Sequence, residues 1–219
     1  MPSISEQKAT QRSTKVILLG LTALCLAGVI TWAGYVQFFT DDLENLPTKI
    51  CDGSVDRDLA TKVLPPARSA DEGFKRQNSG DDLTFYCHVD TSNDSSLWSE
   101  AKVQPLSKAD WLESLQGSSG RDRIIRTSVD GIEAVAKLDT EHAAVYVSCS
   151  PPGVPSYNTP EDYAVTTRVE ANGDLNMTGT ALRQTLTDFA YQVTKHTYEL
   201  ADCKGSRDFP KELPRYEAE

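Results

Sequence analysis

The chain has 219 residues, of which 25% are charged and 39% hydrophobic, and its formal net charge at pH 7 is −10. This length suits one domain with a sizeable core plus terminal segments. The acidic balance argues against nucleic acid and anionic lipid surfaces as partners, because both bind basic patches.

The first element in the chain is an uncharged apolar run of 24 residues, Val16 to Phe39. About 20 apolar residues in a helix cross the hydrocarbon core of a bilayer, so the run predicts a single transmembrane helix over 16–39. Basic residues in the segment 1–15 precede the run, and acidic residues follow it. Because basic residues keep their end of a span inside the cell, we expect a cytoplasmic N-terminus and an extracytoplasmic C-terminal portion in the cell membrane. Residues 41–219 carry a net charge of −12.

Two other interpretations of this run involve processing. A cleaved signal peptide fits the basic start, but its apolar region usually has only about 7–15 residues. The residues after the run also lack a small-x-small cleavage site. A lipid-modified Cys25 would normally follow a small residue, whereas Leu24 precedes it. The sequence therefore favours a retained signal-anchor.

The segment after the run is expected to begin with a short acidic stalk, residues 40–50, in which Pro47 stops the membrane helix. Ser54 is placed to cap a helix over 55–64. The polar, glycine-containing stretch 68–82 is expected to be a loop.

Six later stretches have the apolar–polar alternation or short apolar runs of half-buried strands. We expect strands over 83–89, 97–103, 123–129, 132–138, 142–149 and 163–169. Asp130-Gly131 between two of these runs is a strong hairpin signal. The strands around it predict an antiparallel meander.

Two helices complete the prediction. Ser107 and Asp110 form a capping-box-like start for a helix that ends at Leu115. Apolar residues at helical spacing predict a long helix over 180–201 that packs on the apolar face of the sheet. The charged, proline-containing tail 204–219 is expected to be disordered. The fold class is therefore α+β, an antiparallel sheet covered by helices within a domain over 51–203.

Four cysteines lie outside the apolar run, at positions Cys51, Cys87, Cys149 and Cys203. Their separations of 36, 62 and 54 positions lack the close pairs of a zinc site. An even number outside the membrane predicts two disulfides. Three connectivities are possible, and we prefer Cys51–Cys87 with Cys149–Cys203. The first would tie the leading helix to the sheet, and the second would tie the sheet to the end of the last helix.

Residues that could carry out chemistry are dispersed along the chain. The three histidines, His88, His142 and His196, fall on separate predicted elements. The aspartates near positions 81–82 and 90–94 lack the pattern of an EF-hand. We therefore predict no catalytic residue, no metal site and no cofactor.

The chain resembles the signal-anchored or lipid-anchored extracytoplasmic proteins of actinomycete bacteria. The resemblance rests on the short basic N-terminus, the single span, the stretch LPTKICDGSVDRDLATKVLP, the spaced cysteines and the closing helix before Cys203. It implies a cell-envelope location and brings no catalytic residues.

Two functions from different classes follow as hypotheses. The first is a non-enzymatic module that binds an envelope protein or another ligand near the membrane. The second is an extracytoplasmic hydrolase whose acidic residues converge only in the fold. Convergent acids in a pocket would favour the second hypothesis.

Overall fold

The structure is a computed structural model, and it describes residue 28 and residues 43–116, 123–152, 154, 163–204 and 207–217. The chain divides into two units, residues 1–41 and 42–219. The predicted cytoplasmic segment 1–15 and, apart from Gly28, the predicted transmembrane segment 16–39 lie outside the described residues. Among the helices within the described ranges, none has the length and apolar character that crossing a bilayer requires.

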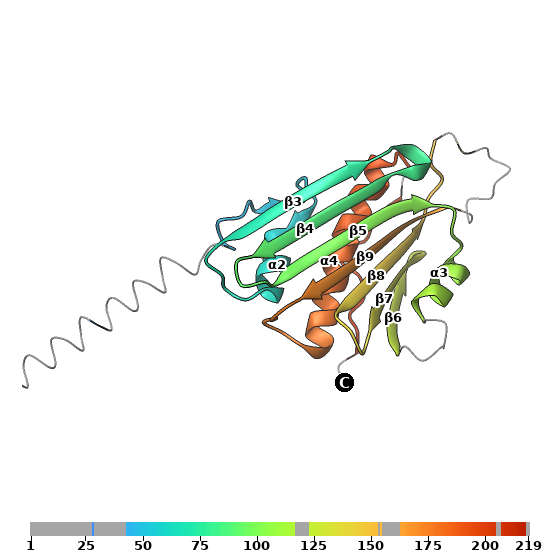
Figure 1. Ribbon diagram of the computed structural model, residues 1–219. Helices are drawn as coiled ribbons and strands as arrows, with labels where there is room; N and C mark the ends of the chain where they lie inside the picture. Colours follow the sequence, from blue (N-terminus) through green and yellow to red (C-terminus); the bar gives the residue numbers. More distant parts are fainter. Residues whose placement is uncertain are drawn as a thin grey trace, which may run out of the picture. The chain divides into compact units, whose positions relative to one another are not determined.

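The second unit is built on an antiparallel sheet of seven strands in the order β3-β4-β5-β9-β8-β7-β6 (Figure 1). The strands are β3 (Ala70–Gln77), β4 (Thr84–Thr91), β5 (Ser96–Gln104), β6 (Ile124–Val129), β7 (Ile132–Lys137), β8 (His142–Ser148) and β9 (Ala164–Asn172). Two meanders, β3–β5 and β6–β9, join into one sheet where β5 pairs with β9. The α+β fold class and all six predicted strands are confirmed.

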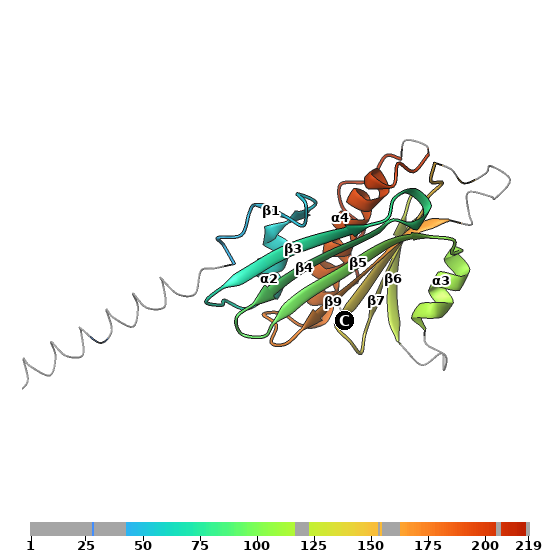
Figure 2. The same ribbon diagram turned by 45° about the horizontal axis from the view of Figure 1, so that its top comes forward.

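In the part of this unit that the structure describes, three α-helices accompany the sheet: α2 (Arg57–Val63), α3 (Lys108–Leu115) and α4 (Gly179–Leu200). The long helix α4 runs across one face of the sheet (Figures 1 and 2). Alternate residues of the strands point towards it, and Phe85, Val89 and Val145 are fully buried there. Leu186 and Phe189 of α4 fill the same core.

The β6–β7 hairpin forms where Asp130-Gly131 predicts it. Both residues have positive φ, 49° and 75°, which a two-residue type I′ turn requires. The predicted helix at Ser107 is also confirmed, because the Ser107 hydroxyl accepts a hydrogen bond from the Asp110 N–H.

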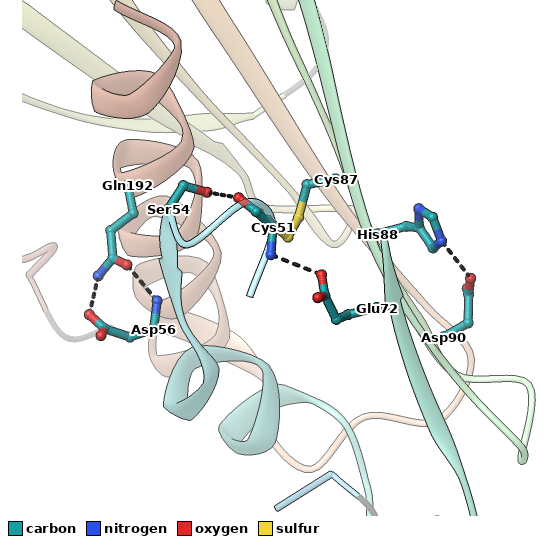
Figure 3. The surroundings of a disulfide bond; sticks show 8 residues. All are labelled: Cys51, Ser54, Asp56, Glu72, Cys87, His88, Asp90 and Gln192. Carbon is teal, nitrogen blue, oxygen red and sulfur yellow. Dashed lines mark hydrogen bonds and ion pairs between the residues drawn. A yellow bond between two sulfur atoms is a disulfide. The ribbon is translucent and has the colours of Figure 1, made fainter. Parts of the chain in front are cut away.

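The disulfides are Cys51–Cys87 and Cys149–Cys203, so the preferred connectivity is confirmed. The first joins the turn before α2 to the middle of β4 (Figure 3). The second joins the end of β8 to the chain that follows α4. Both bridges therefore connect terminal segments of the domain to the sheet, on the side that α4 covers.

The N-terminal segment of this unit adds the short strands β1 (Lys49–Ile50) and β2 (Val55–Asp56), which pair with each other. Gln192 of α4 exchanges two hydrogen bonds with Asp56, one to its backbone N–H and one to its carboxylate (Figure 3). The Lys49 ammonium, 2.9 Å from that carboxylate, holds the pKa of Asp56 below its ordinary value. These contacts fix the segment beside α4.

Two local predictions are wrong. The stretch 68–82 is largely the strand β3, not a loop. β3 is an edge strand in which no residue is fully buried, so its charged residues are compatible with pairing on one side only. Ser54 does not cap the first helix, which begins at Arg57 after Asp56. The Ser54 hydroxyl instead donates a 2.6 Å hydrogen bond to the Cys51 carbonyl.

The C-terminal tail also differs from its prediction. The composition of 204–219 predicts disorder, but residues 207–217 pack along the outer side of α4. Leu213 and Tyr216 are buried, and the Tyr216 N–H donates to the side chain of Gln184. Tyr191 donates a 2.6 Å hydrogen bond to the Pro210 carbonyl. The tail is therefore ordered by a few specific apolar and hydrogen-bonding contacts with α4, although its composition is mostly polar.

Candidate functional site

The face of the sheet opposite α4, which we call the open face, carries most of the polar side chains of the central strands. Strand register places His88, Trp98, Glu170 and His142 in one row across β4, β5, β9 and β8. The next row runs through Tyr86, Glu100, Arg168, Ala144, Val135 and Arg126. Helix α3 packs over the β7–β8 part of this face through Trp111.

A groove of about 260 Å³ lies on the open face beside α3. Strands β5, β8 and β9 form one wall, and α3 with the segment before it forms the other. The lining residues are Glu100, Lys102, Gln104, Leu106, Trp111, Ser114, Leu115, Ala144, Thr166, Thr167 and Arg168. The size is slightly below that of typical pockets for drug-sized ligands, about 300–1,000 Å³. The groove is therefore suited to a small ligand or to one part of a larger one.

One buried carboxylate and two bases define the polar wall of the groove. The Glu100 side chain is only 9% exposed, and its two oxygens contact different cations. Lys102 Nζ lies 2.8 Å from Oε1, and an Arg168 guanidinium nitrogen lies 2.9 Å from Oε2. A buried carboxylate needs such partners, because an unpaired buried charge costs several kcal/mol, roughly 3–5 by deletion of one partner.

Two aromatic residues extend this polar wall towards the β3 edge. The Arg168 guanidinium lies 5.5 Å from the ring centroid of Trp98, within the range of a cation–π contact. Trp98 in turn packs against Tyr86, with ring centroids 6.2 Å apart. The Trp98 ring therefore contacts the Arg168 guanidinium and leaves the side chain 62% exposed.

The opposite wall is apolar except for Ser114. The Trp111 ring of α3 packs on Tyr146 of β8 with centroids 5.4 Å apart, and Trp111 is only 4% exposed. The Tyr146 hydroxyl donates to the Leu106 carbonyl, which holds the segment before α3 against the sheet. Leu115, at the last turn of α3, also lines the groove. The groove thus places a charged wall beside an apolar one.

A second buried carboxylate, Glu133 of β7, lies on the same face outside the groove. Arg126 donates two hydrogen bonds to one of its oxygens, at 3.1 and 2.9 Å, and Lys108 lies 3.9 Å from the other. Glu133 is thus paired in the same way as Glu100. The Lys108 contact links the start of α3 to β7, and the Arg126 contact links β6 to β7, whereas the contacts of Glu100 link β5 to β9.

The three histidines do not converge. His88 lies 3.9 Å from Asp90, and His142 lies 3.1 Å from Glu170. His196 is on the other face, where it lies 3.4 Å from Asp52 and packs edge-on against Phe85. Within the described ranges, no group of three or more His, Cys, Asp or Glu side chains is arranged to hold a metal ion.

A second, wider cavity of about 750 Å³ lies along the C-terminal tail, between Asp130 and the stretch Arg207 to Lys211. One of its polar residues, Arg207, already holds the tail against the sheet, since it donates a 2.7 Å hydrogen bond to the Asp130 carbonyl. The groove on the open face is the better candidate, because its polar and apolar walls converge on one space.

Sequence reasoning did not find this groove. Its residues come from β5, α3, β8 and β9, which are far apart in the chain, and only strand register brings Glu100 beside Arg168. One usable signal was present: an acidic residue inside a strand, flanked by Trp98 and Lys102 at alternate positions. Comparison of the chain with protein-family models, curated proteins and solved structures finds no match.

Proposed function

We propose that the protein is a membrane-anchored, non-enzymatic binding protein of the cell envelope, and that the groove on the open face is its ligand site. The observation that carries this proposal is the convergence of a charged wall and an apolar wall on one groove. A few placed polar groups against an apolar lining are typical of small-molecule sites.

The location in this proposal rests on two independent features. The two disulfides of the domain favour an oxidising, extracytoplasmic compartment. The apolar run 16–39, with bases before it and acids after it, supports a retained anchor with the domain outside. The same arrangement is expected from the resemblance to signal-anchored proteins of actinomycete bacteria.

Binding is favoured over hydrolysis by the way the acids of the open face are used. Each of the two buried carboxylates, Glu100 and Glu133, contacts two basic side chains. These contacts account for both acids as structural groups. A hydrolase would require one of them to act on a bound substrate, and release of a product from a purified preparation would support that alternative.

Site-specific photo-crosslinking in native membranes tests the proposal. A photoreactive amino acid replaces Ser114, which lines the groove from α3, and in a matched control it replaces Glu113, its exposed neighbour on the same helix. We expect an adduct at position 114 that is absent at position 113. Equal labelling at both positions, or none at either, would contradict a ligand site in the groove.

Orientation is tested separately. Single cysteines placed at the two ends of the full-length protein are labelled in intact cells with a membrane-impermeant reagent. We expect labelling at the C-terminal position only. An N-terminus that reacts from outside would reverse the predicted topology.

A further inference from the structure

The open face differs in charge from the rest of the molecule. Residues 41–219 carry a net charge of −12. Two neighbouring cross-strand rows in the middle of the open face nevertheless hold four bases and only two acids. The bases are Lys75, Lys102, Arg126 and Arg168, and the acids are Glu100 and Glu133. Bases therefore outnumber acids in these two rows although the domain as a whole is acidic, and two of the bases, Lys102 and Arg168, line the groove.

The two bases of the groove keep donor capacity for a ligand. Arg168 has five N–H donors and Lys102 has three. The side chains are 62% and 41% exposed, so both charged ends reach solvent at the groove although each also contacts Glu100. Glu100 is 9% exposed and already has a base on each oxygen. The accessible charge in the groove is therefore positive.

The remaining lining includes apolar surface beside that charge. Leu106 and Leu115 contribute partly exposed apolar surface on the α3 side, and the nearly buried Trp111 and Ala144 contribute smaller areas. A ligand that filled this part of the groove would remove apolar area from water at roughly 25 cal/mol per Å². An inorganic anion would contact only the two bases of the groove. A neutral apolar molecule would contact only the apolar wall.

We propose that the groove binds an anionic amphiphile, with its carboxylate or phosphate group on Lys102 and Arg168 and a short apolar portion against Trp111 and Leu115. This inference rests on the proposed function, which makes the groove a ligand site, and it adds the chemical class of the ligand. Two kinds of molecule combine an anionic group with an apolar portion in this way: a soluble organic acid and a lipid of the adjacent membrane.

Three probes that share one apolar portion and differ in their head group test the proposed chemical class of the ligand. The full-length protein in nanodiscs of zwitterionic lipid is titrated with 3-phenylpropionate, 3-phenylpropanol or 3-phenylpropylamine, with empty nanodiscs as background and ligand-observed NMR as readout. Inorganic phosphate tests the head group alone. We expect the acid to bind more tightly than the alcohol, the amine and phosphate, and its affinity to fall with added salt. Tighter binding of the amine, or equal binding of acid and alcohol, would overturn the inference.

Matched charge variants test the site. We expect Lys102→Gln and Arg168→Gln each to weaken binding of 3-phenylpropionate about tenfold, because each removes a charge-assisted hydrogen bond. Arg126→Gln makes the same charge change on the same face but outside the groove lining, and should leave the affinity unchanged. Glu100→Gln should tighten binding, since both bases lose their internal anion. Equal effects of Arg126→Gln and the two groove variants would refute the site.

Failure of this inference can be separated from failure of the proposed function. An adduct at position 114 with no preference for the acid would retain the groove as a ligand site and reject the anionic class. Absence of both the adduct and acid binding would reject both proposals. Where the acid binds, the mass of the adduct formed in native membranes identifies its source, a lipid or a soluble acid.

Discussion

The two faces of the sheet use their residues in opposite ways. On the face beneath α4, alternate strand positions are apolar and fully buried, as with Phe85, Leu97 and Val145. On the open face, the alternating positions of the same strands carry charged and aromatic side chains, and α3 covers only part of them. One face thus supplies most of the folding energy, while the other keeps polar groups accessible in defined positions.

The comparison predicts that the same kind of substitution has unequal effects on the two faces. Phe189→Ala leaves a cavity between α4 and the sheet, where Phe189 is 1% exposed, and should lower the free energy of unfolding by about 3–5 kcal/mol. Denaturant unfolding followed by circular dichroism measures the effect. Trp98→Ala on the half-buried open face is the control, and should cost clearly less. Equal costs would show that the open face is part of the core.

The two disulfides lie on the α4 side of the sheet. Their removal should cause the second largest loss of stability. Removal of Cys149–Cys203 or Cys51–Cys87 by paired serine substitutions should each cost about 2–4 kcal/mol, since each bridge closes a long loop. Thermal unfolding of the two double variants measures the loss, and a reductant should destabilise the wild type in the same direction. A variant with unchanged stability would show that its bridge is dispensable for the fold.

The sequence predicted the α4 face better than the open face. Alternation in β4 and β8 and helical spacing in α4 depend on local patterns, and each element was found within about two residues. β3 was missed because an edge strand tolerates charged residues on both sides. The tail was missed because Leu213 and Tyr216 are single apolar residues among polar ones. The groove depends on register between distant strands, which no local pattern contains.

The ion pairs of the open face should contribute less to the free energy of unfolding than the core does. The cost of breaking a pair depends on whether the remaining charged residue is left buried and unpaired. Lys102→Met with Arg168→Met leaves the buried Glu100 without either base and should destabilise the protein by about 1–3 kcal/mol, less than a fully enclosed pair. Adding Glu100→Leu should recover most of that loss, because the unpaired charge is then gone. Urea unfolding of the double and triple variants provides the comparison. A triple variant no more stable than the double would show that packing, not charge, sets the cost.

The smallest expected effect concerns the C-terminal tail on the outer side of α4. We expect the contribution of this tail to the stability of the protein to decrease at alkaline pH. Burial raises the pKa of Tyr216 to about 12, above the ordinary value of 10.0. Because the folded pKa is the higher one, this contribution is complete below pH 10 and is lost as the pH rises from about 10 to about 12. Tyr191, whose pKa burial also raises to about 12, acts in the same window.

Tyr216→Phe separates this titration from the packing of the tail. The variant loses the 3.0 Å hydrogen bond to Thr187 and should be about 1 kcal/mol less stable at pH 8. Between pH 10 and 11.5 its stability should fall less steeply than that of the wild type, since one titrating hydroxyl is absent. Parallel pH profiles would mean that the tail leaves α4 before Tyr216 ionises, so that the outer side of α4 would be only weakly covered. A shallower profile in the variant would instead establish the tail as a third layer, with α4 enclosed between it and the sheet.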